Sequence, residues 1–185
     1  YKVTTYNTIF SLSDIIMKKI PAINKYSFLY NDKYFNFYTG PMPTFNNQYD
    51  YKKYFRENKI NNMINLCENV NYDEELFEIN NIKIIPLIFS NNLPTKNILY
   101  YLDILFNKWH NNDVINVYFY GTSNTTYGYK KPLLIIGYLV CKHMKHNVKY
   151  YINMIKLDHF DVLSTEQYKW LKQCSDNKNN CCLIV

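Results

Sequence analysis

The chain has 185 residues, which is enough for one domain with a buried core. Its formal net charge is +6, and lysines supply almost all of the positive charge because Arg56 is the only arginine. The lysines are scattered along the chain, a pattern typical of a solvated surface, and no motif of a nucleic-acid-binding module is present. Composition and charge therefore exclude nucleic acid as an expected partner.

The sequence also indicates a cytosolic location. The short apolar stretch from Ser11 to Ile20 is interrupted by charged residues and does not resemble a secretory signal. No apolar run approaches the ~20 residues that a membrane-spanning helix needs. We therefore expect the five cysteines to be reduced thiols. The abundance of Asn, Lys, Tyr, Ile and Phe, which have AT-rich codons, indicates an AT-rich viral or protist genome.

The sequence pattern of the first half of the chain predicts mainly strands, which follow an N-terminal extension at residues 1–25. The expected elements are a helix at Leu12–Ile20, strands at Tyr26–Tyr30 and Tyr34–Tyr38 around an Asn31–Lys33 turn, a helix at Tyr49–Asn58, and strands at Asn62–Leu66 and Lys83–Phe89. Pro86 has no N–H to donate, so we expect it to lie at a position of the last strand where no ladder hydrogen bond is needed. The acidic run Asp73-Glu74-Glu75 is interpreted as a solvated turn rather than a catalytic pair.

The second half predicts mainly helices. The expected elements are a helix capped by Thr95 and running to about Trp109, a strand at Val114–Tyr120, and helices at Pro132–His143, Asn147–Ile155 and Thr165–Gln173. The side chains expected to face inward from the first of these helices are those of Ile98, Tyr101, Leu102, Leu105 and Phe106. This alternation predicts an α/β domain over residues 26–174, with a central, mostly parallel sheet flanked by helices, followed by a flexible tail at 175–185.

The segment Gly121–Val140, GTSNTTYGYKKPLLIIGYLV, follows a predicted strand and runs into an apolar helix. A strand, a short loop and a buried helix are the usual parts of a phosphate-binding loop, because N–H groups and the dipole at a helix N-terminus favour an anion. Cysteine phosphatases add a thiolate and an arginine to such a loop. The alternative is an ordinary strand-to-helix turn that never bound phosphate.

Four stretches stand out along the chain, in the order NLCENVNYD, INNIKIIPLIFSNNLPTKNI, GYKKPLLI and KNNCCLIV. They resemble stretches of the prenylated protein tyrosine phosphatases called phosphatases of regenerating liver (PRL), within the wider family of tyrosine and dual-specificity phosphatases. NLCENVNYD is similar to the family's VRVCEATYD, and GYKKPLLI is similar to its GLGRAPVLV. INNIKIIPLIFSNNLPTKNI resembles the stretch with the family's general-acid loop, and KNNCCLIV resembles its prenylation signal. They occur in the family's order from about Tyr26 onward, which implies its three-layer cysteine-phosphatase fold.

The resemblance implies that the catalytic residues are missing. Aligned on Pro132, the nucleophilic cysteine falls on Asn124, the histidine before it on Ser123 and the phosphate-binding arginine on Lys130. The general-acid aspartate falls on Ser90. The degenerate loop positions are Ser123, Asn124, Thr125, Thr126, Tyr127, Gly128, Tyr129 and Lys130. No other register restores the motif, because the residues six places after Cys67, Cys141 and Cys174 are Asp73, Asn147 and Asn180.

These replacements predict a protein without phosphatase activity. An asparagine amide is no usable nucleophile, a serine does not act as a general acid as a carboxylic acid does, and a lysine lacks the planar grip of arginine. We therefore expect a pseudophosphatase that acts by binding, with no cofactor. Weak binding of an anion or a phosphoinositide stays open, and a magnesium-transporter regulatory domain is the candidate partner that the resemblance implies. The alternatives are a weak phosphate-ester hydrolase using a loop hydroxyl, or a structural, virion-type protein.

The last four residues, Cys182-Leu183-Ile184-Val185, match a prenylation box. We expect a prenyl group on Cys182, with Cys181 as a candidate site for a second lipid, because one lipid gives only marginal membrane binding. The expected location is then cytoplasmic and membrane-associated. The alternative is a hydrophobic chain end without a lipid.

Two further cysteines have simpler interpretations. Cys67 matches the family's second, resolving cysteine, but with Asn124 opposite it has no redox partner, so a buried structural thiol is expected. Cys141, His143 and His146 lie close in sequence, yet no fourth ligand is evident and we expect no metal.

Overall fold

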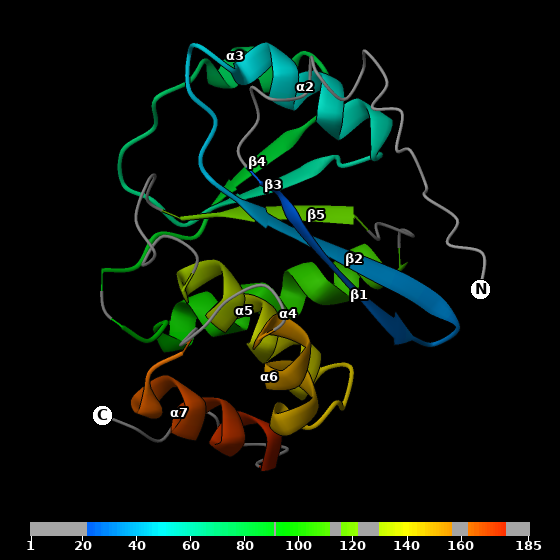
Figure 1. Ribbon diagram of the computed structural model, residues 1–185, viewed down its shortest axis with the longest axis vertical. Helices are drawn as coiled ribbons and strands as arrows, with labels where there is room; N and C mark the ends of the chain where they lie inside the picture. The colour runs from blue at the N-terminus through cyan, green and yellow to red at the C-terminus, as the bar shows by residue number, and fades with distance from the viewer. Residues whose placement is uncertain (1–21, 91, 112–115, 122–129, 157–162, 177–185) are drawn as a thin grey trace, which may run out of the picture.

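A five-stranded sheet with strand order β1-β2-β5-β3-β4 forms the centre of the molecule (Figure 1). The computed structural model describes residues 22–90, 92–111, 116–121, 130–156 and 163–176. Its strands are β1 Asn24–Tyr30, β2 Lys33–Gly40, β3 Asn62–Asn65, β4 Lys83–Pro86 and β5 Asn116–Tyr120. Its helices are α2 Gln48–Glu57, α3 Glu74–Glu78, α4 Lys96–Asn111, α5 Lys130–Lys142, α6 Val148–Lys156 and α7 Thr165–Asp176. The predicted helix at Leu12–Ile20 lies outside the described residues.

The sheet is mostly parallel, as predicted. β2, β5, β3 and β4 run parallel to one another, and only the edge strand β1 is antiparallel to its neighbour β2. The β1–β2 connection is a tight hairpin in which Asn31 and Asp32 both have positive φ angles, 48° and 61°. Asn and Asp tolerate this conformation better than most residues, which explains why the chain reverses here.

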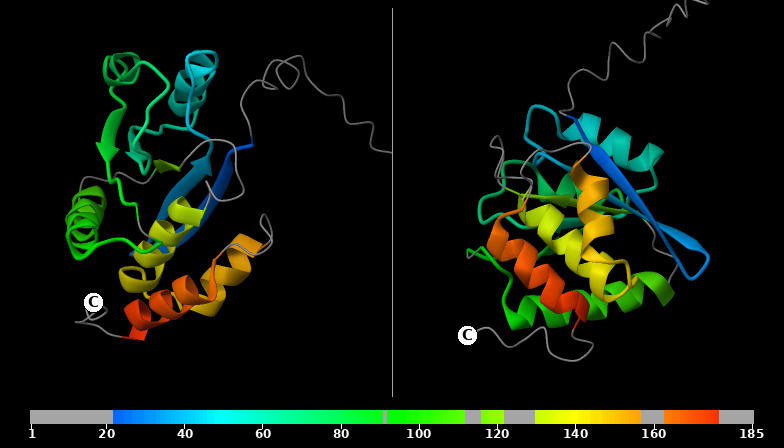
Figure 2. Two further views of the ribbon diagram at one scale, coloured as in Figure 1. Left: turned by 90° about the vertical axis from the view of Figure 1, so that its left-hand side faces the viewer. Right: turned by 60° about the horizontal axis from the view of Figure 1, so that its bottom comes forward.

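Helices cover both faces of the sheet, which gives three layers. α2 and α3 lie on one face and α4, α5, α6 and α7 on the other, as the two turned views in Figure 2 also show. The side chains of β5 alternate between the two cores. Val117 and Phe119 pack with the larger helical layer, whereas Tyr118 and Tyr120 pack with α2 and α3. This two-residue period is the pattern of a strand buried on both faces.

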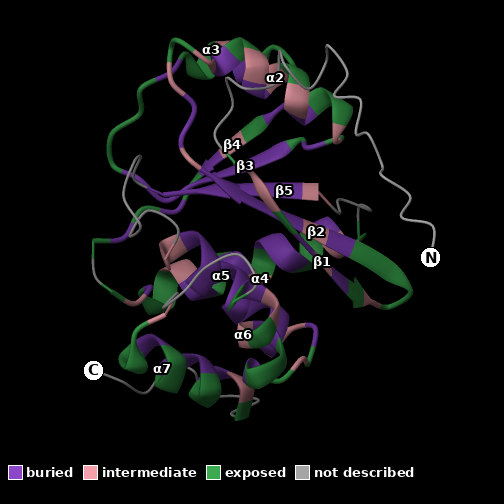
Figure 3. Cartoon of the chain, in the orientation of Figure 1, coloured by how far each residue is buried: buried purple, intermediate pink, exposed green. Residues whose placement is uncertain are grey.

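α5 is the central helix of the larger layer. Every residue from Pro132 to Cys141 is buried, so the ribbon of α5 is almost entirely purple in Figure 3. The helix contacts the sheet on one side and α4, α6 and α7 on the others. Its continuous apolar sequence is therefore explained by burial on all sides rather than by an amphipathic face.

The predicted strand at Lys83–Phe89 was too long. β4 ends at Pro86, which is the last residue of an edge strand, so its missing N–H costs no ladder hydrogen bond. The backbone continues in contact with β3, since Leu87 donates its N–H to the carbonyl of Asn65 at 2.7 Å. β3 likewise ends at Asn65, one residue before the predicted end at Leu66.

Two smaller predictions were wrong. The acidic run begins the short helix α3 instead of forming a turn: Asp73 is its N-cap and accepts a hydrogen bond from the N–H of Leu76 at 3.4 Å. Carboxylates are favoured in the first turn of a helix because they complement its dipole. Tyr101 of α4 was expected to face inward but is 41% exposed, because the buried stripe of α4 runs through Leu102, Leu105 and Trp109 instead.

α2 and α3 end in the same way. A residue in the left-handed conformation follows each helix, Lys59 with φ 53° after α2 and Asn81 with φ 60° after α3. In both cases the next residue, an isoleucine, donates its N–H to the carbonyl of a phenylalanine five positions earlier, at 2.8 Å after α2 and 3.0 Å after α3. This is the hydrogen bond of a Schellman-type cap, which satisfies the last carbonyls of a helix.

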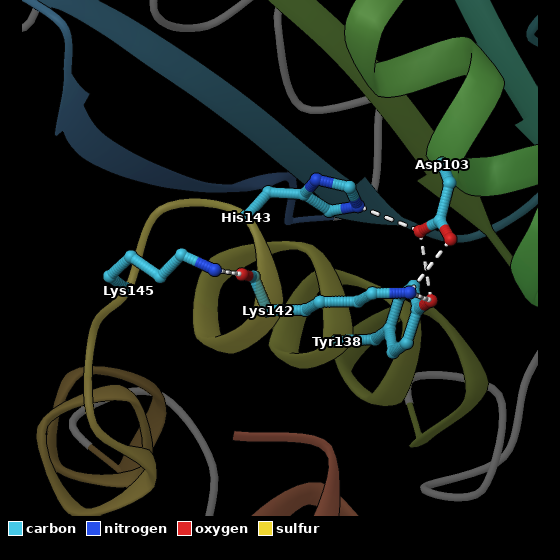
Figure 4. Close-up of polar contacts among 5 residues, drawn as sticks. All are labelled: Asp103, Tyr138, Lys142, His143 and Lys145. Atoms are coloured by element: carbon cyan, nitrogen blue, oxygen red, sulfur yellow. Dashed lines mark hydrogen bonds and ion pairs between the residues drawn. The ribbon is translucent and has the colours of Figure 1, made fainter. Parts of the chain in front are cut away.

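A polar cluster connects α4 to α5 within the larger layer (Figure 4). The carboxylate of Asp103 accepts hydrogen bonds from the Tyr138 hydroxyl at 2.8 Å and the Lys142 ammonium at 2.7 Å, and the His143 ring nitrogen lies 2.7 Å away. The His143 ring also stacks on Phe106, with centroids 4.5 Å apart. Burial raises the pKa of Asp103, but the hydrogen bonds from His143, Lys142 and Tyr138 outweigh it, so the pKa lies below its usual value.

Replacing the carboxylate, as in Asp103→Asn, is expected to lower the free energy of unfolding by about 1–3 kcal/mol near neutral pH. The sign follows from the lowered pKa: the ionised group stabilises the fold above its unfolded-state pKa, and this contribution is lost as pH falls through the folded-state pKa. Urea unfolding at pH 7 and at pH 3 should therefore show a smaller difference between variant and wild type in acid. Asp176→Asn, at an exposed position at the end of α7, is the control, and an equal loss in that variant would contradict the assignment.

Candidate functional site

A cavity of about 400 Å³ opens at the carboxyl ends of β3 and β4. Its lining comes from the segments that follow those strands, from the loop after β2 and from the first turn of α5. The lining residues are Met42, Leu66, Cys67, Glu68, Asn69, Ser90 and Lys131. In an open parallel sheet, the carboxyl ends of the strands are the usual place for a ligand.

The backbone after β3 is held by two hydrogen bonds. The side-chain oxygen of Asn65 accepts from the N–H of Cys67 at 2.7 Å, in a buried position. The N–H of Leu66 donates to the carbonyl of Tyr120, the last residue of β5, at 3.1 Å. A short polar side chain that bonds to the backbone two residues on is typical of a tight turn. Asn65 thus fixes the position of Cys67 at the cavity.

The Cys67 thiol is unreactive in this setting. The residue is 3% exposed, which confirms the expectation of a buried thiol. Burial raises the pKa of Cys67 to about 11, although the charge of Lys131 lowers it in part. The thiolate is the reactive form of cysteine, so almost all of Cys67 is in the unreactive thiol form at neutral pH.

Two tyrosine hydroxyls lie beneath the end of β5. The hydroxyls of Tyr72 and Tyr120 are 2.6 Å apart and share a buried hydrogen bond. Burial raises the pKa of both groups well above the usual value for tyrosine. Neither hydroxyl therefore ionises at neutral pH, and the pair stabilises the strand end rather than acting as a base.

Lys131 is the cation of the cavity. Its ammonium donates a hydrogen bond to the carbonyl of Phe89 and lies 4.8 Å from the centroid of the Phe89 ring. These contacts tie the first turn of α5 to the segment after β4. An anion entering the cavity would meet a positive charge that is already positioned by the protein.

The predicted site residues are only partly placed by the structure. Ser90 is exposed and lines the cavity, next to Lys131. Lys130 is the first residue of α5 and is half-buried, but it does not line the cavity. The loop positions Ser123–Tyr129 and the tail residues Cys181 and Cys182 lie outside the described residues.

Four lining residues were not singled out as site residues from the sequence: Met42, Leu66, Glu68 and Asn69. The signal that could have found Glu68 and Asn69 is their position directly after a buried strand of a parallel sheet, where ligand-binding side chains are common. Met42 gives no such signal, because it reaches the cavity through the loop after β2.

Among the described residues that line the cavity, no nucleophile is hydrogen-bonded to a base. Nucleophilic catalysis requires a nucleophile within hydrogen-bond reach of a base. Ser90 and Glu68 both line the cavity, but the structure records no hydrogen bond between them. The arrangement offers one cation, one carboxylate, a neutral hydroxyl, an amide and an apolar wall.

The histidines near Cys141 have separate partners. His143 contacts Asp103, whereas the His146 ring stacks on Tyr150 with centroids 4.9 Å apart. No group of three or more metal-ligating side chains occurs among the residues that the structure describes. Within the same residues, no helix has both the length and the apolar character required to traverse a bilayer.

Comparisons of sequence find no relative, since no protein-family model and no curated protein sequence matches the chain. Comparisons of structure do find similar folds. A putative protein tyrosine phosphatase from Leishmania major matches with a TM-score of 0.61 and 15% identity, over 75% of this chain and 87% of that one. PTPMT1 in complex with PI(5)P matches with a TM-score of 0.58 and 13% identity, over 76% of this chain and 90% of that one.

A third similar structure is the core catalytic domain of the PP-IP phosphatase SIW14 from S. cerevisiae in complex with citrate. It matches with a TM-score of 0.55 and 14% identity, over 78% of this chain and 83% of that chain. At such low identities the likeness concerns the fold alone. The sheet and its flanking helices match those of the tyrosine phosphatases, and the chain therefore has the fold of the protein tyrosine and dual-specificity phosphatases.

Proposed function

We propose that this chain is a non-catalytic, phosphatase-like binding protein related to the PRL group, whose sequence stretches it resembles. The observation that carries the proposal is the composition of the cavity at the carboxyl ends of β3 and β4. Ser90, which the resemblance aligns with the family's general acid, lines that cavity, and the thiol of Cys67 is protonated because its pKa is about 11. The sequence supplies no replacement, since Arg56 precedes β3 and lies at the other end of that strand.

The ligand that suits this cavity is an anion, in particular a phosphate group. Lys131 provides a positive charge at the start of α5, where the helix dipole also favours negative charge. A lysine binds phosphate as a point charge rather than by the two-point grip of arginine, so the affinity is expected to be modest. The complex of PTPMT1 with PI(5)P indicates that a phosphoinositide headgroup is a suitable probe.

Titration with inorganic phosphate and with a soluble phosphoinositide headgroup tests this binding. Amide resonances of Ser90, Lys131 and the segment 122–130 are expected to shift in a saturable manner. Lys131→Met should weaken binding by about tenfold, since hydrogen bonds to charged groups are worth about 1.5–3 kcal/mol. Lys172→Gln, on the exposed side of α7, makes the same change in net charge and is the control. Absence of shifts near Lys131 would end the proposal of anion binding.

The proposal includes a protein partner. The resemblance to PRL supports a magnesium-transporter regulatory domain as the candidate, bound through the face that carries the cavity. A binding assay with such a domain, repeated with Lys131→Met, would test both the partner and the face. A structural or virion role would instead be supported by recovery of the chain from purified particles of its host.

We further propose that Cys182 carries a prenyl group, supported by the sequence Cys-Leu-Ile-Val. In eukaryotic cells the wild-type protein is expected to partition mainly into the membrane fraction, and Cys182→Ser mainly into the soluble fraction. Cys181→Ser should cause a smaller loss, because a second lipid adds to the binding of the first. Mass spectrometry of the tail peptide should show the added mass of a prenyl group on Cys182. Equal membrane partition of Cys182→Ser and wild type would refute this part of the proposal.

A further inference from the structure

A second cavity, of about 240 Å³, lies at the opposite end of the parallel strands from the first. It is formed where α2 and α3 end and where β3 and β4 begin, so the two cavities are separated by the length of those strands. Its lining residues are Lys52, Phe55, Arg56, Lys59, Ile60, Asn61, Asn80, Asn81 and Ile82.

The charge of this cavity is entirely positive. Lys52 and Arg56 are one turn apart on the same face of α2, and Lys59 follows the helix. No acidic residue lines the cavity, and the nearby Glu57 and Glu78 are exposed. The three cations form no ion pair with any residue in the described ranges. Like charges one turn apart repel one another, so the cluster lacks the counter-charge that would stabilise it.

Hydrogen bonds at the helix ends reduce the repulsion that the backbone around the cavity exerts on an anion. The C-terminus of a helix carries partial negative charge on its last carbonyls. At the ends of α2 and α3 those carbonyls accept hydrogen bonds from the caps, including side-chain amides: Asn58 donates to Tyr54 at 2.9 Å and Asn80 to Leu76 at 2.6 Å. The left-handed residue after each helix, Lys59 or Asn81, fixes the chain reversal, and the side chains of both residues line the cavity.

From these features we propose that the cavity is a binding site for a small ligand that carries a phosphate group. Arg56 presents a planar guanidinium, which matches phosphate by two parallel hydrogen bonds, and the two lysines add charge for a dianion or a higher charge. The buried side chains of Phe55, Ile60 and Ile82 form an apolar floor for the remainder of the ligand. Pockets for drug-sized ligands have volumes of about 300–1,000 Å³. This cavity, at about 240 Å³, is smaller and suits a ligand of the size of a sugar or inositol phosphate. The site is independent of the function proposed above.

Isothermal titration calorimetry of the full chain with pyrophosphate and with inositol trisphosphate, at low ionic strength, tests the proposal. Arg56→Gln and Lys59→Asn are each expected to weaken binding by about tenfold, because each removes one charged donor. Asparagine tolerates the left-handed conformation of Lys59, so the second variant removes the charge without disturbing the cap. Lys172→Gln, with the same change in net charge, should bind as wild type does.

Two further comparisons separate the outcomes. Lys131→Met weakens only the binding proposed for the cavity with Ser90, so Arg56→Gln should still weaken phosphate binding by about tenfold when it is introduced into Lys131→Met. Failure here and failure of the function proposed above are therefore distinguishable. Binding to phosphatidylcholine vesicles that contain a phosphoinositide is compared with binding to soluble inositol trisphosphate. Tighter binding to the vesicles would identify a lipid as the source of the phosphate, and tighter binding to inositol trisphosphate would identify a soluble ligand. The proposal is overturned if Arg56→Gln binds as wild type does, or if poly-glutamate competes as well as the phosphates, which would mean attraction to acidic protein segments.

Discussion

The purified protein is expected to release phosphate from para-nitrophenyl phosphate no faster than a protein-free blank. A positioned general acid contributes about 10²–10⁴-fold to the rate of a reaction. The resemblance to the PRL family aligns its general-acid aspartate with Ser90, which is not a carboxylic acid. Removing the nucleophile of a serine protease costs about 10⁶-fold in rate, and the resemblance to the PRL family aligns the nucleophilic cysteine with Asn124. The Cys67 thiol does not replace it, because its pKa of about 11 leaves little thiolate at neutral pH.

The control for this assay is an active cysteine phosphatase purified by the same procedure. Turnover by the wild-type chain that disappears in Lys130→Met, Lys131→Met or Glu68→Gln would favour the competing function, a hydrolase in which a hydroxyl is activated by a cavity carboxylate. Turnover unchanged in all three variants would indicate a contaminant. A rate above the blank that depends on any one of these residues would therefore contradict the non-catalytic proposal.

Gly137→Val is expected to lower the free energy of unfolding by about 3 kcal/mol through overpacking, which corresponds to a fall in Tm of about 6–12 °C. A Cβ atom at Gly137 would lie 2.7 Å from a ring carbon of Tyr151 and 2.9 Å from a methyl of Leu171. Tyr151 is fully buried and its hydroxyl is hydrogen-bonded to the carbonyl of Leu133, so the ring has little room to move. The close approach of α5 to α6 and α7 therefore depends on the absence of a side chain.

Thermal unfolding followed by circular dichroism would measure this effect. Gly137→Ala should cost less than Gly137→Val, because alanine gains about 1 kcal/mol of helix propensity over glycine. Asn153→Val introduces the same side chain at an exposed position of α6 and should leave Tm nearly unchanged. A Tm for Gly137→Val equal to that of the control would show that α5 does not pack as closely as the structure has it.

The sequence by itself determined the order of the described strands and helices, apart from the short helix α3. Short runs rich in apolar and aromatic residues marked the strands, and the helical spacing of Tyr51, Tyr54 and Phe55 marked α2. Local chemistry also sufficed for the turn at Asn31 and for the edge position of Pro86, because backbone preferences act within a few residues. The missing arginine and nucleophilic cysteine were evident without a structure, since a motif with fixed spacing either occurs or does not.

Only the tertiary structure decided which residues share a site. Glu68 and Lys131 are far apart in the chain. They line the same cavity because the segment after β3 and the first turn of α5 lie at the same edge of the sheet. The basic cavity likewise requires the ends of α2 and α3 to lie side by side, which depends on the parallel pairing of β3 with β4. The exposure of Tyr101 was misjudged for the same reason: helical periodicity gives the spacing of an apolar stripe, but packing against the other elements decides which flank of that stripe is covered.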